Sequence, residues 1–287
     1  MQPHVTTFFD DATHTFSYVV TDPATRQCAL IDSVLDYEQA SGHIATTSAD
    51  RMVNYIQANG LSVQWLLETH VHADHLSAAA YLRRRVGGTL AIGEHIRDVQ
   101  GAFSRLLNIE AERLAQEAPF GHLFRDGERF SIGSLEGFAL HTPGHTPACM
   151  TYVIGDAGFV GDTLFMPDYG TARCDFPGGD ARQLYRSIQK IFQLPDETRL
   201  FMCHDYKAPG RDEYRNETTV GQERTYNVHV HEGVTEDGFV AMRTARDATL
   251  KMPALILPSV QVNIRAGELP PPESNGIHYL KIPLNAV

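Results

Sequence analysis

The stretch Glu68-Thr-His-Val-His-Ala-Asp-His75 constrains this chain more than any other. Five of its eight residues have side chains that can bind a metal ion, namely Glu68, His70, His72, Asp74 and His75. A single histidine is most often a surface residue or a hydrogen-bonded core residue. Three histidines and an aspartate within six consecutive positions are hard to explain in that way, so the pattern predicts a metal site.

This cluster lies between a predicted strand and a predicted helix. Residues 63–67 are apolar enough for a buried strand, and residues 76–86 have apolar side chains at helical spacing before Gly87 ends the helix. Open α/β sheets place their ligands at the C-terminal ends of strands. An alternative role for Asp74 is to cap this helix.

Composition limits the class of protein. A chain of 287 residues with 43% hydrophobic and 21% charged residues can form a substantial core. Its 24 basic and 35 acidic residues give a net charge of −11, which argues against nucleic acid as the main partner, because phosphate binding needs a basic face. The sequence has no run of about 18 apolar residues, so we expect no membrane span.

Two features predict a cytoplasmic protein with free thiols. Residues 1–10 lack the basic opening and the apolar core of a secretory signal. The cysteines are far apart and form no CxxC pair; they are Cys28, Cys149, Cys174 and Cys203.

The other expected elements alternate between β-rich and helical stretches. Strands are expected at residues 6–9, 15–20, 27–31, 129–132, 137–141, 150–154, 158–161 and 199–203. Helices are expected at residues 49–58, as a pair within residues 94–117 near the mouth of the site, and after Asp180, which has the spacing of an N-cap. We interpret residues 1–287 as a single domain, in which residues from about 207 onward form a helical and extended region packed on the rest.

Three later segments resemble the first cluster, because each places a possible ligand after a strand. His145 lies in a turn that Pro143 and Gly144 make rigid, and Asp162 and His204 each end a predicted strand. Gly161 allows a close backbone approach beside Asp162. Long intervals separate these residues, so only the tertiary fold can bring them together.

In this order the motifs resemble those of the metallo-β-lactamase superfamily, which are T-H-x-H-x-D-H, a histidine in P-G-H-T, Gly-Asp and a final histidine. The resemblance covers residues from about 15 to 206. It implies an α/β fold, the αββα four-layer sandwich of two mixed sheets, with the metal site along one edge.

The superfamily resemblance leaves two metal centres open. If His70, His72, Asp74, His75, His145, Asp162 and His204 all coordinate, they form a dinuclear hydrolase site as in glyoxalase II, where two metals activate a bridging water. If only His70, His145 and Asp162 coordinate, they form a facial triad with open positions on one side, which is typical of non-haem Fe(II) oxygenases. Oxygen chemistry needs a redox-active ion, and Zn²⁺ is not one.

The loop after Asp162 resembles that of persulfide dioxygenases through its Arg173-Cys-Asp175-Phe176 segment. The segments 203–206 and 223–227 also resemble this group. Two departures concern the subgroup and the details of the substrate: Thr171 stands near a position where the mitochondrial enzymes have a cysteine, and the segment between residues 92 and 124 is longer.

The dioxygenase resemblance implies specific roles. His70, His145 and Asp162 hold one Fe(II) per chain, whose open face takes glutathione persulfide and O₂. Arg173 binds a glutathione carboxylate and Asp175 holds Arg173, although the two could instead form a purely structural ion pair. Cys174 is interpreted as a bystander. The residues that surround the ion and orient its ligands are His72, Asp74, His75, His204 and Tyr206.

Other functions remain as alternatives. The main rival is a glyoxalase II-like dinuclear zinc thioester hydrolase, and another is a metal or thiol sensor without turnover. A secreted β-lactamase is disfavoured because no signal peptide is seen. The family resemblance also implies a homodimer.

Overall fold

Two mixed six-stranded sheets form the centre of the protein. The computed structural model describes residues 2–110, 114 and 120–285. The first sheet contains, in spatial order, β1 (His4–Asp10), β2 (Thr15–Thr21), β3 (Gln27–Ile31), β6 (Ser62–Leu67), β8 (Thr89–Gly93) and β9 (His122–Phe124). The second contains β10 (Arg129–Ile132), β11 (Leu135–His141), β12 (Met150–Ile154), β13 (Ala157–Phe159), β14 (Arg199–Phe201) and β15 (Glu217–Thr219).

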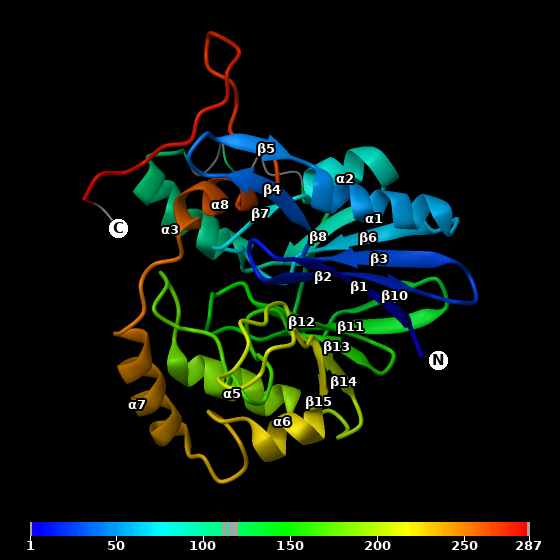
Figure 1. Ribbon diagram of the computed structural model, residues 1–287, viewed down its shortest axis with the longest axis vertical. Helices are drawn as coiled ribbons and strands as arrows, with labels where there is room; N and C mark the ends of the chain where they lie inside the picture. The colour runs from blue at the N-terminus through cyan, green and yellow to red at the C-terminus, as the bar shows by residue number, and fades with distance from the viewer. Residues whose placement is uncertain (1, 111–113, 115–119, 286–287) are drawn as a thin grey trace.

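Helices cover the outer faces of both sheets (Figure 1). Helices α1 (Thr47–Ala58) and α2 (Ala79–Val86) pack on the first sheet, and α5 (Ala181–Ile191), α6 (Val220–Tyr226) and α7 (Glu236–Asp247) lie on the side of the second. Helices α3 (Ile96–Leu107) and α8 (Ile256–Asn263) share a smaller apolar cluster. This arrangement confirms the αββα sandwich. Among the described residues, no helix has the length and apolar character that a membrane crossing requires.

Strand β2 shows why the sequence forms these layers. Its seven residues are all buried, and successive side chains point to opposite faces. Tyr18 and Val20 join the cluster between the two sheets, whereas Val19 joins the cluster under α1 and α2. Burial of each large apolar side chain contributes about 1.5–3 kcal/mol. Burial on both faces therefore fixes the position of β2 in the sandwich. It also fixes the position of the turn between β1 and β2.

The direction of the strands determines which edge of each sheet carries the possible ligands. Strand β3 is parallel to β6, and β6 is parallel to β8, so their carboxyl ends meet at one edge of the first sheet. In the second sheet, β13 is parallel to β14, and Asp162 and His204 follow these strands. The two edges face each other, which brings the segments after β6, β13 and β14 together.

Most expected elements are confirmed, with several shifts of boundary. Residues 76–86 are not one helix: Leu76–Ser77 forms strand β7, which pairs with β4 (Val34–Glu38) in a small sheet that also holds β5 (His43–Ala45), and α2 starts at Ala79. The residue before α2 is Ala78, and no side chain caps the helix, so the capping role for Asp74 is wrong. Asp180 caps α5 as expected, through bonds from the backbone N–H groups of Arg182 and Gln183. Of the helix pair expected within residues 94–117, α3 is present, and residues 111–113 and 115–119 lie outside the described part.

Candidate metal centre

Seven possible ligands come together where the two sheets meet. His70, His145 and Asp162 each offer one ligand atom, and these three atoms lie within 4.8 Å of one another. A second group meets the same criterion and consists of His72, Asp74, His75 and His204. The structure thus brings together every ligand predicted from the motifs except Glu68, which lies behind His72 and accepts a hydrogen bond from Ser77 Oγ at 2.8 Å.

Within the part of the chain that the structure describes, the atoms that face this centre make no hydrogen bond, although His204 Nε2 lies within ion-pair distance of Asp74 and Asp162, at 3.3 and 3.4 Å. Buried polar atoms without a hydrogen bond are rare in folded proteins and call for a ligand, an ion or water. Here six such atoms gather in one place: His70 Nε2, His72 Nδ1, Asp74 Oδ2, His75 Nε2, Asp162 Oδ1 and His204 Nε2. Imidazole nitrogens and carboxylate oxygens are common ligands of zinc and iron. The donor set fits a transition-metal site.

His70 is held from behind by a short hydrogen-bond chain. Asp32 accepts bonds from the Thr69 N–H at 2.7 Å and from Thr69 Oγ1 at 2.8 Å. The hydroxyl donates its only proton to Asp32. It therefore accepts a hydrogen bond from His70 Nδ1, which lies 3.0 Å away. Nε2 of His70 is left with a lone pair towards the centre. Burial, followed by the charges of His72 and His145, lowers the pKa of His70 well below its usual range, and metals bind the neutral ring.

His145 is held by the loop that carries the Arg-x-Asp-Phe segment. Its Nδ1 lies 2.8 Å from the carbonyl oxygen of Arg173, which can only accept, so Nδ1 carries the proton and Nε2 faces the centre. Phe176 packs edge-on against His145, with ring centroids 5.1 Å apart. The ligand and the loop are therefore positioned together.

Gly161 permits the approach of Asp162 to this group. Its φ of 52° is in the left-handed region, and a Cβ there would lie 2.5 Å from Thr69 Oγ1. This confirms the close approach expected from the sequence.

His72 faces the centre with Nδ1, whereas His70 and His145 face it with Nε2. Its Nε2 lies 3.1 Å from Asp32 and 3.4 Å from Glu68, so Nε2 carries a proton and Nδ1 faces the centre. Burial favours the neutral ring, but the two carboxylates outweigh it and raise the pKa of His72 well above its usual value. A histidine that donates its distal N–H to a carboxylate is also the arrangement typical of metal ligands.

Asp32 is a functional residue that the motif analysis missed. It contacts both Thr69 and His72, it is buried, and its φ of 51° is unusual for a residue other than glycine. The sequence did contain a signal. Asp32 follows the buried strand β3 just as the histidine cluster follows β6, and parallel neighbours end at the same edge.

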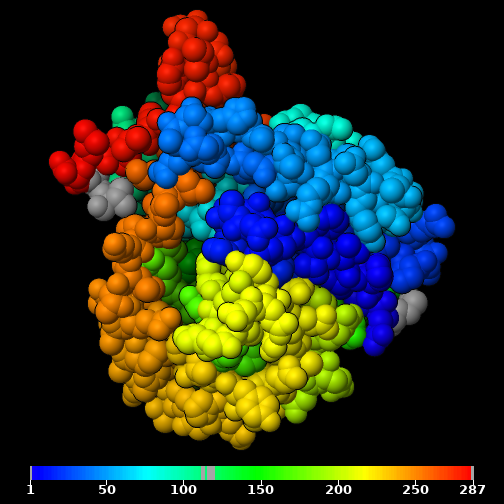
Figure 2. Space-filling model, viewed as in Figure 1, coloured from blue at the N-terminus to red at the C-terminus, as the bar shows by residue number. Residues whose placement is uncertain are grey.

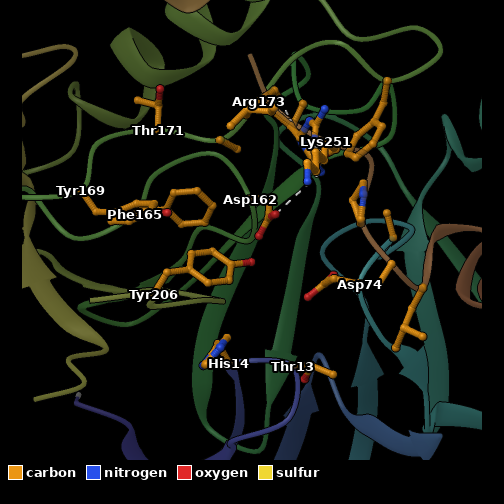
Figure 3. Close-up of a pocket in the computed structure, with 18 of the residues that line it drawn as sticks. Thr13, His14, Asp74, Asp162, Phe165, Tyr169, Thr171, Arg173, Tyr206 and Lys251 are labelled. Atoms are coloured by element: carbon orange, nitrogen blue, oxygen red, sulfur yellow. Dashed lines mark hydrogen bonds and ion pairs between the residues drawn. The ribbon is translucent and has the colours of Figure 1, made fainter. Parts of the chain in front are cut away.

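A pocket of about 400 Å³ opens beside the centre, within the size range of small-molecule sites. Figure 2 shows the hollow, bordered by the dark-blue N-terminal segment and the orange segment after α7. Its wall includes Asp74, His145 and Asp162, and Figure 3 shows the hydroxyl of Tyr206 directed into the same space as the carboxylates of Asp74 and Asp162. Removal from water, followed by those two charges, raises the pKa of Tyr206 well above its usual value. Tyr206 therefore offers a proton-bearing hydroxyl.

Cations line the side of the pocket away from the N-terminal turn. The Arg173 guanidinium bonds both oxygens of Asp175 at 2.6 Å, bonds the carbonyl oxygen of Lys251 at 2.7 Å and lies over the Phe176 ring. Arg246 and Lys251 also line the pocket and are exposed, and their side-chain charges have no hydrogen bond or ion pair within the described residues. Arg173 and Asp175 were predicted from the sequence, whereas no motif marks these two cations.

The cysteines behave as structural thiols. All four are free and buried. Burial, followed by the charge of Asp247, raises the pKa of Cys174, so its thiol keeps its proton. This favours the interpretation of Cys174 as a bystander.

Residues 10–204 match the family model of the metallo-beta-lactamase superfamily. The chain belongs to this superfamily, whose fold and metal-ligand motifs it shares.

Some relatives of the chain are named as hydrolases and others as dioxygenases. It is 59% identical over 290 residues to a Burkholderia pseudomallei protein named as a probable metallo-hydrolase, covering 98% of each chain. It is 31% identical over 267 residues to the mouse mitochondrial persulfide dioxygenase ETHE1, covering 92% of this chain and 89% of the relative. Among solved structures, ETHE1 from Myxococcus xanthus superimposes with a TM-score of 0.75 at 30% identity, covering 92% of this chain and all of the other. The chain spans 65% of the length of the Xylella fastidiosa beta-lactamase hydrolase-like protein, with 52% identity.

Proposed function

We propose that the protein is a glutathione persulfide dioxygenase with one Fe(II) per chain, held by His70, His145 and Asp162. The segment Arg173–Phe176 carries this proposal. It holds His145 through the Arg173 carbonyl, packs Phe176 on that ring and places the Arg173 side chain in the pocket wall. The same segment resembles the loop of persulfide dioxygenases, and the similarity to ETHE1 proteins in sequence and structure supports the same reaction.

The proposed reaction converts glutathione persulfide, O₂ and water into glutathione, sulfite and two protons. The outer sulfur loses four electrons, which O₂ gains, and the bond between the two sulfur atoms breaks. Fe(II) would supply open coordination positions and the redox chemistry that O₂ needs. The pocket brings the reactants together beside the triad.

The cationic wall suits a thiol carrier with carboxylates. Glutathione has two carboxylates, and Arg246 and Lys251, which are exposed and form no ion pair with the residues that the structure describes, offer two positive charges at the pocket rim. Asp175 and the Lys251 carbonyl fix the guanidinium of Arg173, which keeps the face turned away from Phe176 and its remaining N–H groups for the substrate.

One observation favours the alternative, a dinuclear thioester hydrolase of the glyoxalase II type with zinc. The second group, with His72, Asp74, His75 and His204, has buried nitrogen and oxygen atoms that make no hydrogen bond with the described residues, and His72 has the carboxylate behind it that ligating histidines usually have. The name of the Burkholderia pseudomallei relative agrees with a hydrolase.

Metal content and turnover separate the two functions. Protein purified without added metal would be analysed for iron and zinc, and then supplied with glutathione persulfide or with S-lactoylglutathione. We expect about one iron per chain, O₂ uptake and sulfite formation with the persulfide. Two zinc ions per chain, with thioester cleavage and no O₂ uptake, would establish the hydrolase instead.

A further inference from the structure

Helix α7 contains a buried ion pair that the proposed reaction does not use. Arg243 and Asp247 lie one helical turn apart, and their side chains are 1% and 7% exposed. Arg243 Nη2 lies 2.6 Å from Asp247 Oδ1, and Nε donates to the same oxygen at 2.9 Å. The cost of removing two charges from water largely offsets their attraction, so a buried pair is weak evidence for stability. This pair therefore calls for another explanation.

The other polar atoms of the pair contact the backbone of the loop 162–179. Arg243 Nη1 donates to the carbonyl oxygen of Thr171 at 3.0 Å, and Asp247 Oδ2 accepts from the N–H of Cys174 at 2.9 Å. Thr171 and Cys174 are themselves buried, and buried backbone groups need hydrogen-bond partners. The ion pair thus holds the loop on both sides of residues 172–173.

Arg173 connects this loop to the metal centre and to the pocket. Its carbonyl oxygen lies 2.8 Å from His145 Nδ1, and its side chain lies in the pocket wall. Its guanidinium also donates to the carbonyl oxygen of Lys251, in the segment after α7, at 2.7 Å. Figure 3 shows Thr171, Arg173 and Lys251 on the side of the pocket opposite Thr13. A shift of the loop relative to α7 would therefore move a possible metal ligand and a pocket residue together.

We propose that Arg243 and Asp247 are positioning residues, which fix the loop 162–179 against α7. The loop then keeps the Arg173 carbonyl against His145 and the Arg173 side chain in the pocket wall. The guanidinium of Arg243 suits this task because its N–H groups point in fixed directions and reach two acceptors at once. The hold on His145 applies to either kind of metal centre, whereas the part that Arg173 plays in substrate binding rests on the proposed function.

Hydrogen exchange in the metal-free full chain tests the proposal without any turnover. The variant Arg243→Met/Asp247→Leu replaces both charges by apolar side chains, so neither charge is left unpaired and the chain is expected to fold. The N–H of Cys174 then loses its acceptor, and we expect its amide to exchange at least about tenfold faster. Amides of the neighbouring helix α5 should keep their rates. Unchanged exchange at Cys174 would overturn the proposal.

Zn²⁺ titration of the same proteins measures the effect on the metal centre. The variant His145→Gln identifies the binding step that needs His145. We expect Arg243→Met/Asp247→Leu to weaken that step by about tenfold, since groups that orient a ligand typically change metal affinity by about 10- to 100-fold. An unchanged affinity would show that His145 is held without the ion pair, against the proposal.

A second variant decides if the double variant does not fold. Arg243→Lys keeps the charge beside Asp247 but lacks the planar fork that also reaches the Thr171 carbonyl. We expect faster exchange at Cys174 and weaker Zn²⁺ binding, each by less than in the double variant. No change in either measurement would contradict the proposal.

The matched control is Phe239→Leu, which removes volume from the buried side of α7 but keeps both charges. Phe239 is fully buried and packs against Tyr185 of α5. We expect this variant to lose stability in urea unfolding but to bind Zn²⁺ like the unmodified chain. If it weakens Zn²⁺ binding as much as the double variant does, the ion pair serves stability alone and the proposal is wrong.

Kinetics of the Fe(II)-saturated enzyme separate this inference from the proposed function. In the double variant we expect KM for glutathione persulfide to rise by about tenfold, with a smaller change in kcat, and in Phe239→Leu we expect an unchanged KM. If no persulfide is turned over by the unmodified chain, the proposed function fails, while hydrogen exchange and Zn²⁺ affinity still decide whether Arg243 and Asp247 position the loop.

Discussion

Three imidazoles of the metal centre each have their own acceptor on the side away from the centre. For His70 it is a threonine hydroxyl anchored on Asp32, for His145 a backbone carbonyl, and for His72 a pair of carboxylates. Such groups fix the orientation and tautomer of a ring before any ion binds, which lowers the reorganisation needed on binding. The geometry of the centre therefore depends on these hydrogen-bond acceptors as well as on the possible ligands.

Asp162 is the single carboxylate of the proposed iron triad, so its charge is expected to be essential. Asp162→Asn keeps the shape but removes the negative charge, and we expect loss of iron and of O₂ uptake together. Metal analysis and an oxygen electrode measure both. Asp156→Asn is the control, since Asp156 is paired with Arg199 at the other end of β13. Full iron content in Asp162→Asn would remove Asp162 from the ligand set.

Asp74 distinguishes one metal from two. It belongs only to the second group, and its side chain is 24% exposed, so Asp74→Asn is expected to fold. His72→Ala is less suitable, because it would remove the imidazole that pairs with the buried carboxylates of Asp32 and Glu68, at a cost of about 3–5 kcal/mol. With a mononuclear centre, Asp74→Asn keeps one iron per chain. Loss of one of two ions on metal analysis would show a dinuclear centre.

At the scale of elements, the cationic side of the pocket is made by the loop 162–179, the end of α7 and the segment 248–255 that follows it. They are joined by the bond from Arg173 to the Lys251 carbonyl. The segment 248–255 supplies the charge of Lys251, and α7 supplies that of Arg246. We interpret this pair of segments as the part that selects the substrate.

We expect Arg246→Met and Lys251→Met each to raise KM for glutathione persulfide with little change in kcat or iron content. Loss of one exposed charge-assisted hydrogen bond costs about 1.5 kcal/mol, or roughly tenfold in kcat/KM. Arg182→Met is the control, because Arg182 pairs with Glu236 outside the pocket. An unchanged KM in both variants would show that the carboxylates bind elsewhere.

His229 holds the loop 162–179 through a hydrogen bond, and it makes the stability of the protein depend on pH. Its Nδ1 accepts a hydrogen bond from the Thr171 N–H at 3.0 Å. Burial, followed by the charges of Arg243 and Arg246, lowers the pKa of His229 to about 4. An unfolded histidine has a pKa of about 6.5, so between these values the unfolded chain binds a proton that the folded chain does not. The free energy of unfolding therefore falls as the pH drops through this range.

Urea unfolding at pH 7 and pH 5 measures this contribution. We expect the unmodified protein to lose about 1 kcal/mol more between these pH values than His229→Gln, which keeps an acceptor for Thr171 but cannot be protonated. His231→Gln serves as a control at an exposed neighbouring position. Equal pH dependence in the unmodified protein and His229→Gln would contradict the assignment.

Elements with a strong local pattern could be predicted from the sequence, and those set by tertiary pairing could not. Helix α5 has a capping aspartate and an apolar face, and α1 has an apolar face, all of which act locally. Leu76–Ser77 has a helical pattern but pairs with β4, a partner far away in the sequence. In the same way, motifs indicated the ligands and the end of a buried strand pointed to Asp32, whereas Lys251 is recognised only once the fold brings it to the pocket.

At the scale of the whole molecule, the metal centre lies between the two sheets. His70, His72 and His75 follow β6 of the first sheet, while His145, Asp162 and His204 belong to the second. An ion bound there links both halves of the sandwich only in the folded state. The two halves are otherwise joined mainly by the apolar cluster between the sheets, which includes Tyr18, Tyr152 and Phe159.

Removal of the metal should therefore destabilise the entire protein. A ligand that binds only the folded state contributes about 4 kcal/mol when its free concentration is a thousand times Kd. For a chain of this size, we expect treatment with a chelator to lower Tm by roughly 10 °C, with recovery after Fe(II) is added under anaerobic conditions. Asp162→Asn, which lacks a ligand, should show little response to either treatment in calorimetry. If chelation leaves Tm unchanged while metal analysis shows that the ion has gone, the two sheets hold together without the metal, and the centre contributes to chemistry but not to folding.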